Sequence, residues 1–154
     1  MEPLVTVIIP ALNEENTIGF CLEKVRAGCN QYNIPYEIII ADSSTDDTPH
    51  IAHTYGAHII HPEKRGYGNA YLSAFPHAKG KIIVIGDADD TYDFSLIPDL
   101  IRPITEERAD MVIGSRLKGN ILPGSMPWLH QYIGNPLLTR LLNFTFHSNF
   151  SDTH

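Results

Sequence analysis

Residues 81–90 read Lys-Ile-Ile-Val-Ile-Gly-Asp-Ala-Asp-Asp. The first half is a short apolar run that predicts a buried strand over Lys81–Ile85, and the second half is an acidic turn centred on Asp87-Ala88-Asp89. Similar β-branched runs occur at Val5–Ile9 and Glu37–Ala41, and each leads into a polar segment and then a helical pattern. This stretch therefore predicts a protein in which buried strands alternate with helices.

The same alternation continues along most of the chain. Further strands are expected at Ala57–His61 and Asp110–Ile113. Helical patterns lie between the strands: one opening at Asn13–Asn16, one ending at Gly56, one from Lys64 to near Gly80, and one over Phe94–Glu107. Short strands joined by helices form right-handed crossovers, so we expect the α/β fold class, with a Rossmann-like, mostly parallel sheet and flanking helices.

After Ser115 the pattern changes. Residues Leu117–Pro127 carry glycines and prolines without periodicity and predict a loop, and Trp128–Phe146 returns to helical spacing. We therefore expect a single domain with a core over residues 1–116 and a loop and helix over residues 117–154.

Composition narrows the function classes. The chain has 154 residues, 43% hydrophobic and 19% charged, which is ordinary for a soluble globular protein. A net charge of -7 argues against a nucleic-acid binder, which would show a basic face. No signal-peptide pattern and no apolar run of about 20 residues is visible, so we expect a cytoplasmic chain. Its cysteines, Cys21 and Cys29, are then expected as free thiols rather than a disulfide.

Polar side chains follow the predicted strands at the points where the strands end. They are Asn13, Glu14, Asp42, Asp87, Asp89, Ser115 and Arg116. Because parallel sheets bind ligands beyond the carboxyl ends of their strands, we expect these residues to meet at one edge. Carboxylates brought together there repel one another unless a cation lies among them.

The acidic turn is the strongest candidate site. Asp87 and Asp89 offer two oxygen donors that suit Mg²⁺ or Mn²⁺, with further oxygens from a substrate diphosphate. The alternative is a solvated turn that caps the next helix, but a position after a buried strand, with Asp42 ending another, favours the metal. Thr91 could be a further ligand or a helix cap.

Three other positions have both a ligand-binding and a structural interpretation. Asp42 could accept hydrogen bonds from a nucleobase or ribose, or could form an Asx-turn. Glu14 could contact the same ligand, or could favour the start of a helix electrostatically. Gly66 and Gly68 flank Tyr67 and would let the backbone approach a ligand, although this short motif is weak by itself.

Six segments occur in an order that resembles a known family. They are Val5–Glu15, Asp42–Thr48, Gly66–Ala70, Asp87–Asp89, Gly114–Arg116 and Ser151–Thr153. Together they resemble family 2 glycosyltransferases of the GT-A fold, and among these the polyprenyl-phosphate glycosyltransferases, the class of the dolichyl-phosphate mannose and glucose synthases. The resemblance covers essentially the whole chain.

The resemblance implies roles for individual positions. Pro10, Ala11 and Glu14 correspond to the first nucleotide-contacting segment. Asp42 corresponds to the aspartate that contacts the base. Gly66 and Gly68 are also expected to bind the nucleotide, by letting the backbone approach it closely.

The remaining implied roles concern the metal and the reaction. Asp87 and Asp89 correspond to the metal- and diphosphate-binding pair, and Asp89 is also expected to be a catalytic residue. Thr91 stands where mannose synthases commonly have a glutamine ligand. Arg116 corresponds to an arginine near the donor and acceptor phosphates, and Asp152 to an acidic residue near the acceptor.

The implied activity is transfer of a hexose from UDP-glucose or GDP-mannose to a polyprenyl phosphate, with inversion and with Mg²⁺ or Mn²⁺. The lipid acceptor would bring the chain to the cytoplasmic face of a membrane as a peripheral protein. Relatives usually continue beyond the position of His154, so the alternative is a nucleotide-sugar-binding fragment without catalysis. A receiver-like signalling domain is disfavoured because the third predicted strand ends in His61-Pro62 rather than in a phosphoacceptor aspartate.

Overall fold

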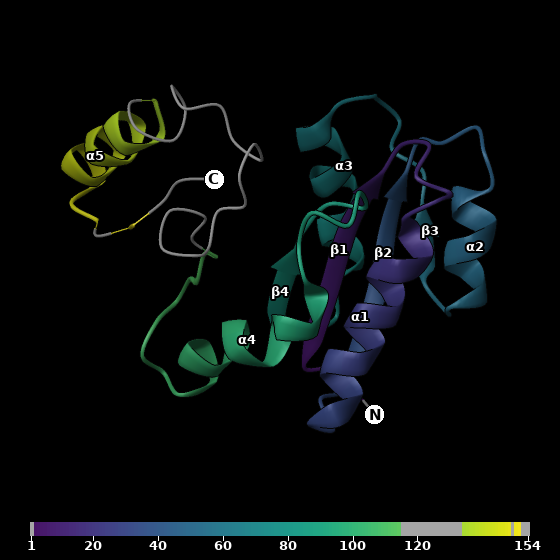
Figure 1. Ribbon diagram of the computed structural model, residues 1–154, viewed down its shortest axis with the longest axis horizontal. Helices are drawn as coiled ribbons and strands as arrows, with labels where there is room; N and C mark the ends of the chain where they lie inside the picture. The colour runs from purple at the N-terminus through teal and green to yellow at the C-terminus, as the bar shows by residue number, and fades with distance from the viewer. Residues whose placement is uncertain (1, 115–133, 149, 152–154) are drawn as a thin grey trace. The chain divides into compact units, whose positions relative to one another are not determined.

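The computed structural model describes residues 2–114, 134–148, 150 and 151. The chain divides into two compact units, Met1–Ile101 and Arg102–His154 (Figure 1), and each is described by itself. The boundary expected between residues 116 and 117 lies outside the described residues and stays a prediction.

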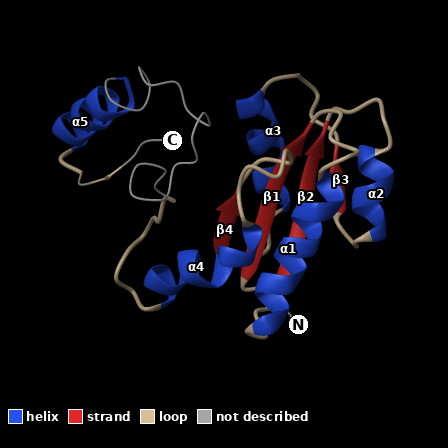
Figure 2. Cartoon of the chain, viewed as in Figure 1, coloured by secondary structure: helices blue, strands red, loops and turns tan. Residues whose placement is uncertain are grey.

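The first unit is built on a parallel sheet (Figure 2). Its strands are β1 (Val5–Ala11), β2 (Tyr36–Asp42), β3 (His58–Ile60) and β4 (Ile82–Ile85), in the order β3-β2-β1-β4. All three neighbouring pairs are parallel, which confirms the expected α/β fold class. The central strands β1 and β2 are buried on both faces along most of their length, whereas every second residue of β4 is exposed.

Helices lie on both faces of this sheet. They are α1 (Ile18–Gln31), α2 (Thr48–Thr54), α3 (Tyr67–Ala74) and the first part of α4 (Ile97–Thr105), with short 3₁₀ helices η1 (Phe75–His77) and η2 (Phe94–Leu96). Figure 1 shows α1 in front of the sheet and α3 behind it. On the α3 face, Ile8 and Ile39 pack with Tyr71 and Ala74 in one buried cluster. Each fully buried isoleucine there contributes roughly 2 kcal/mol through the hydrophobic effect.

The buried face of α1 follows from its helical spacing. Ile18, Cys21, Leu22, Val25 and Cys29 are all fully buried. Both cysteines are free thiols, as expected. Burial raises the pKa of the Cys29 thiol to about 11.

Strand β1 is longer than the sequence predicts, because it runs through Pro10 to Ala11. The carbonyl of Ala11 accepts a hydrogen bond from the amide of Ser43, which follows β2. Alternate residues of a strand point their backbone groups to opposite neighbours, so the missing N–H of Pro10 faces the side of β4. The ladder with β4 has already ended at Ile8, so the proline removes no hydrogen bond there.

The predicted fifth strand is wrong, since residues 110–113 form no strand. The described sheet has the order β3-β2-β1-β4 without a strand from this segment, and Met111 is exposed. An apolar run becomes a strand only with a paired neighbour, which composition alone does not supply. The preceding helical pattern is confirmed in part: it starts as η2 and ends at Thr105 rather than Glu107.

In the second unit, α5 (Asn135–Phe146) lies inside the helical pattern expected over Trp128–Phe146. The expected loop over residues 117–127 and the start of that pattern lie outside the described residues. Among the helices that the structure describes, none has the length and apolar character needed to cross a membrane.

Candidate active site at the carboxyl ends of the strands

The loops that follow β1 and β2 form one side of the site. The register pairs Ala11 with Asp42, so the two strands end side by side. Asn13 has a left-handed backbone with φ of 59°, a conformation that asparagine adopts more readily than most residues. Its amide donates to Ser44 Oγ at 2.8 Å, and its Oδ1 accepts from the Thr45 amide at 2.9 Å. Asn13 therefore fastens the first loop to the second.

A second set of contacts continues this connection. The Glu14 amide donates to Thr48 Oγ1 at 2.8 Å, and Thr48 Oγ1 donates to Asp46 Oδ1 at 2.6 Å. The Glu14 carboxylate accepts from the Thr17 hydroxyl at 2.9 Å, next to the start of α1. Glu14 thus has a structural place in the loop, and its nucleotide contact stays a prediction.

Asp42 is a buried carboxylate at the end of β2, with 2% of its surface exposed. Its Oδ1 accepts from the Ser44 amide at 3.3 Å, which is the Asx-turn that the sequence allowed. The ring of His61 lies nearby, with Nδ1 at 3.7 Å from Asp42 Oδ2. A buried carboxylate with so few donors keeps acceptor capacity for a ligand, which fits the expected contact with a base or ribose.

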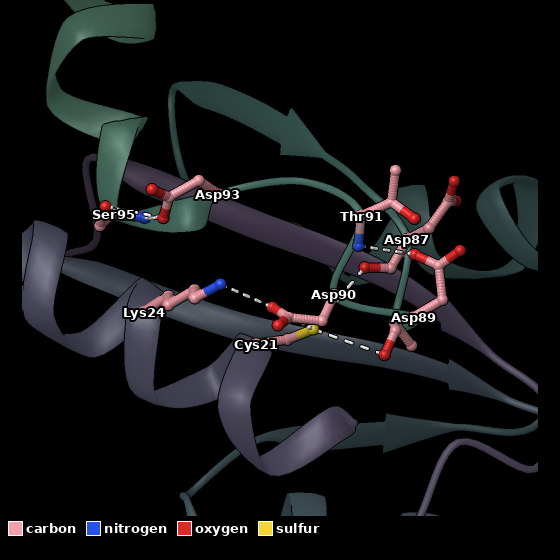
Figure 3. A network of polar contacts seen from close by, with 9 residues as sticks. Cys21, Lys24, Asp87, Asp89, Asp90, Thr91, Asp93 and Ser95 are labelled. Atoms are coloured by element: carbon pink, nitrogen blue, oxygen red, sulfur yellow. Dashed lines mark hydrogen bonds and ion pairs between the residues drawn. The ribbon is translucent and has the colours of Figure 1, made fainter. Parts of the chain in front are cut away.

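The acidic turn follows β4, and its carboxylates point in two directions (Figure 3). Asp87 and Asp89 project away from α1, whereas Asp90 points toward it. Asp89 Oδ1 accepts from the Thr91 amide at 3.0 Å. The cap of η2 is Asp93, whose Oδ1 accepts from the Ser95 amide and hydroxyl, so Asp93 takes the capping place considered for Thr91.

Two side chains of helix α1 contact the acidic turn. Lys24 Nζ lies 2.8 Å from Asp90 Oδ1, and this hydrogen bond raises the pKa of the lysine (Figure 3). Asp90 itself has a left-handed φ of 62°. The Cys21 thiol donates to the carbonyl of Ala88 at 3.4 Å. These contacts fix the backbone of the turn and use its third carboxylate, while Asp87 and Asp89 have no lysine or arginine partner within the described chain.

Two tyrosines of α3 complete the site, and sequence reasoning missed them. Tyr67 donates from its hydroxyl to Asp87 Oδ1 at 2.7 Å, and Tyr71 donates to the Tyr67 hydroxyl oxygen at 3.2 Å. Burial raises the pKa of Tyr67, and the hydrogen bond to Asp87 raises it further, so Tyr67 stays a donor at neutral pH. The Gly66-Tyr67-Gly68 motif drew attention to backbone freedom, and Gly66 does have a φ of 130°. The side chain between the glycines reaches the acidic turn.

The donor set of the turn fits a small divalent cation that is shared with a ligand. Asp87 and Asp89 each use one oxygen in the contacts above and keep the other without a protein donor among the described residues. No three His, Cys, Asp or Glu side chains of the described residues gather into a metal-binding group. Mg²⁺ commonly takes one or two carboxylates and completes its shell with water and substrate phosphates. The chemistry of the turn therefore suits Mg²⁺ or Mn²⁺ together with a diphosphate.

The other expected site residues divide into two groups. Pro10 is half-buried and Ala11 is buried, so a ligand would meet mainly the backbone of this segment. Arg116 and Asp152 lie outside the described residues, and their roles stay predictions. A hollow of about 670 Å³ lies near the amino ends of β1 and β2, lined by residues that include Pro3, Tyr36 and Lys79, and has no part in this site.

Comparison with known proteins gives a consistent family. The model of the family "Glycosyl transferase family 2" matches residues 6–154. The chain is 50% identical over 152 residues to a low-salt glycan biosynthesis hexosyltransferase of Haloferax volcanii, covering 99% of this chain and 37% of that relative. It is 32% identical over 151 residues to a dolichyl-phosphate hexose transferase of the same organism, covering 96% of this chain and 61% of the relative. The chain thus spans less than two thirds of either relative.

Solved structures show the same architecture. The mannosyl-3-phosphoglycerate synthase from Rubrobacter xylanophilus matches with a TM-score of 0.61 at 22% identity, over 68% of this chain and 37% of that one, which bears on the fold alone. The glucosyl-3-phosphoglycerate synthase from Mycobacterium tuberculosis, solved with Mn²⁺, UDP and glucosyl-3-phosphoglycerate, matches with a TM-score of 0.57 at 30% identity. That match covers 67% of this chain and 39% of the synthase.

Proposed function

This chain belongs to glycosyl transferase family 2, and we propose that it supplies the donor side of a hexose transfer from a nucleotide-diphospho-sugar to a polyprenyl phosphate. The donor is UDP-glucose or GDP-mannose, and the transfer inverts the anomeric centre. The acceptor would bring the protein to the cytoplasmic face of a membrane. The second candidate is a nucleotide-sugar-binding fragment that does not transfer the hexose, and the transfer test below separates the two candidates.

One observation carries the proposal: the acidic turn presents two carboxylates that have no cation partner among the described residues. Lys24 pairs with Asp90 and leaves Asp87 and Asp89 facing the other way (Figure 3). Such an arrangement costs free energy through repulsion unless a cation binds there. Asp42 ends β2, which β1 separates from β4 in the sheet, and this carboxylate would accept hydrogen bonds from the nucleoside.

The donor-side residues would each have a separate role. A divalent cation at the turn would stabilise the negative charge of the leaving diphosphate. Asp87 and Asp89 would hold that cation, with Thr91 as the candidate third ligand, and Asp42 would orient the nucleoside. The backbone of Pro10 and Ala11 and the glycines Gly66 and Gly68 would line the nucleotide.

Two roles concern the acceptor side. Arg116 would neutralise phosphate charge, and Asp152 would position the acceptor. A phosphate acceptor is ionised near neutral pH, so positioning and charge neutralisation would contribute more than a general base.

Support for the donor and the acceptor comes from proteins that resemble this chain. A relative named dolichyl-phosphate hexose transferase supports a polyprenyl-phosphate acceptor. A structural neighbour solved with Mn²⁺ and UDP supports a metal-bound uridine nucleotide. We therefore favour UDP-glucose over GDP-mannose as the first donor to test.

The binding test compares UDP, GDP and dTDP by thermal shift and calorimetry, each with and without Mn²⁺. One nucleotide should raise the melting point when Mn²⁺ is present, by the mass-action effect of a ligand that binds only the folded state. Asp89→Asn should abolish this effect. Asp93→Asn is the matched control, since Asp93 is a nearby carboxylate that caps η2. Metal-independent binding, or equal losses in both variants, would contradict the proposal.

The transfer test separates the two candidate functions. The chain is incubated with the best donor, Mn²⁺ and a polyprenyl phosphate in detergent, and the lipid-linked hexose is measured. Product that depends on Asp89 supports the enzyme. Tight nucleotide binding without product supports the binding fragment.

A further inference from the structure

We infer that Tyr67 is a positioning residue for the donor site: its hydroxyl holds the Asp87 carboxylate in the orientation in which that carboxylate accepts a divalent cation. The inference rests on the proposed function, which places a cation at Asp87. The two can fail separately, because one concerns whether the turn binds Mn²⁺ and the other concerns how its ligand is oriented.

The contact between the two side chains is short and charge-assisted. Tyr67 Oη lies 2.7 Å from Asp87 Oδ1, within the range of a hydroxyl that donates to an ionised carboxylate. Asp87 follows the end of β4 and is only half-buried, so packing alone does not fix its torsion angles. The hydrogen bond selects one orientation and engages Oδ1, which leaves Oδ2 for a cation.

Tyr67 needs support of its own, because 62% of its surface is exposed. Tyr71 provides this support from one turn further along α3. Its hydroxyl donates to the Tyr67 oxygen at 3.2 Å, and the two rings meet edge to face with centroids 5.1 Å apart. Since Tyr71 donates to that oxygen, the Tyr67 proton is directed to Asp87, and hydrogen bonds in series strengthen one another.

Tyr71 is in turn fixed by the core. Tyr71 is 8% exposed, and its ring stacks on that of Phe75 with the ring centroids 6.1 Å apart. It also belongs to the buried cluster that contains Ile8 and Ile39. A continuous set of contacts therefore leads from the centre of the sheet through two hydroxyl groups to a candidate metal ligand. Groups that orient a metal ligand in this way commonly change metal affinity about 10- to 100-fold when they are removed.

The experiment uses the whole chain and Mn²⁺ as the probe. Binding is followed by the electron paramagnetic resonance signal of free Mn²⁺, first alone and then with UDP. Tyr67→Phe removes the hydroxyl and keeps the ring, and we expect about 10-fold weaker Mn²⁺ affinity. Tyr71→Phe leaves the direct contact in place, and we expect a smaller loss of about 3-fold.

Tyr55→Phe is the matched control. The Tyr55 hydroxyl donates to Glu23 Oε1 at 3.0 Å, so this variant also breaks a tyrosine–carboxylate hydrogen bond, but between the residue that follows α2 and α1. We expect Mn²⁺ affinity to stay at the wild-type value. The carboxyl carbon resonance of Asp87 in ¹³C-aspartate-labelled, metal-free protein should move in Tyr67→Phe and stay in place in Tyr55→Phe.

The outcomes are separable. Wild-type affinity in Tyr67→Phe, with loss in Asp89→Asn, would overturn the inference and leave the proposed function standing. A loss that appears only in Tyr67→Leu would show that the ring acts rather than the hydroxyl, which also overturns the inference. Absence of Mn²⁺ binding in the wild-type chain would overturn the proposed function and the inference with it.

Discussion

Replacing Thr6 with valine would remove a hydroxyl that joins three segments at the amino ends of the strands. Thr6 is fully buried in β1. Its Oγ1 donates to Glu37 Oε1 of β2 at 2.7 Å and accepts from the Gly80 amide, just before β4, at 2.8 Å. The same Glu37 oxygen accepts from the Lys79 amide at 2.6 Å. Valine keeps the shape of threonine and loses both contacts.

The expected cost follows from these contacts. A hydrogen bond to a charged group contributes about 1.5–3 kcal/mol, and an amide left without a partner costs about 1 kcal/mol or more. The buried methyl that replaces the hydroxyl returns about 1 kcal/mol. We therefore expect Thr6→Val to lower the free energy of unfolding by about 2 kcal/mol. Thr6→Ser keeps the hydroxyl and loses one buried methyl group, so we expect a cost of about 1 kcal/mol.

Urea denaturation followed by far-ultraviolet circular dichroism measures both variants. A double-mutant cycle between Thr6→Val and Glu37→Ala should give a coupling of about 1 kcal/mol, since the two side chains share a hydrogen bond. The reasoning fails if Thr6→Ser is destabilised more than Thr6→Val. Zero coupling in the cycle would refute the assigned contact itself.

Three further predictions concern other parts of the fold. Gly28→Ala should lower the unfolding free energy by about 1–3 kcal/mol, measured by the same denaturation, because a Cβ at Gly28 would lie 2.8 Å from the Ser95 carbonyl oxygen. Lys24→Met should leave the melting temperature almost unchanged, because the ion pair with Asp90 is part-exposed. The same variant should weaken Mn²⁺-dependent UDP binding about 2- to 5-fold in calorimetry, because this ion pair helps to fix the acidic turn. Burial raises the pKa of Cys29 to about 11, so the unfolded thiol ionises first and stability should fall as pH rises from about 9 to 11. Denaturation midpoints across that range should decline more in the wild type than in Cys29→Ala.

Local sequence patterns predicted the four strands of the described sheet. The β-branched runs at Val5–Ile9 and Glu37–Ala41 lie in β1 and β2 because apolar residues of this type fit strands buried on both faces. The place of the site follows from the same reasoning, since polar residues directly after parallel strands must share one edge. Asp42 and Asp87 are found there for that reason.

Tertiary contacts were not accessible from these patterns. The hydrogen bond from Tyr67 to Asp87 joins residues 20 apart, and its formation depends on how α3 packs against the sheet. The contact between Asn13 and Thr45 spans 32 residues and depends on a left-handed backbone at Asn13. At residues 110–113 the sequence pattern predicted a strand that does not form, because an apolar run alone does not show whether a neighbouring strand is available to pair with it.

The sheet order has a consequence for how the protein is made. β1 is the first strand in the chain and lies inside the sheet, yet its neighbour β4 pairs with it only through residues 82–85. Until a ribosome has synthesised that segment, the backbone N–H and C=O groups on one edge of β1 have no partner strand, and open edges of this kind promote aggregation. Pairing between strands so far apart in the sequence is also slow. Nascent chains that stop before Ile82 should therefore depend on chaperones, whereas chains that extend past Ile85 can complete the centre of the sheet.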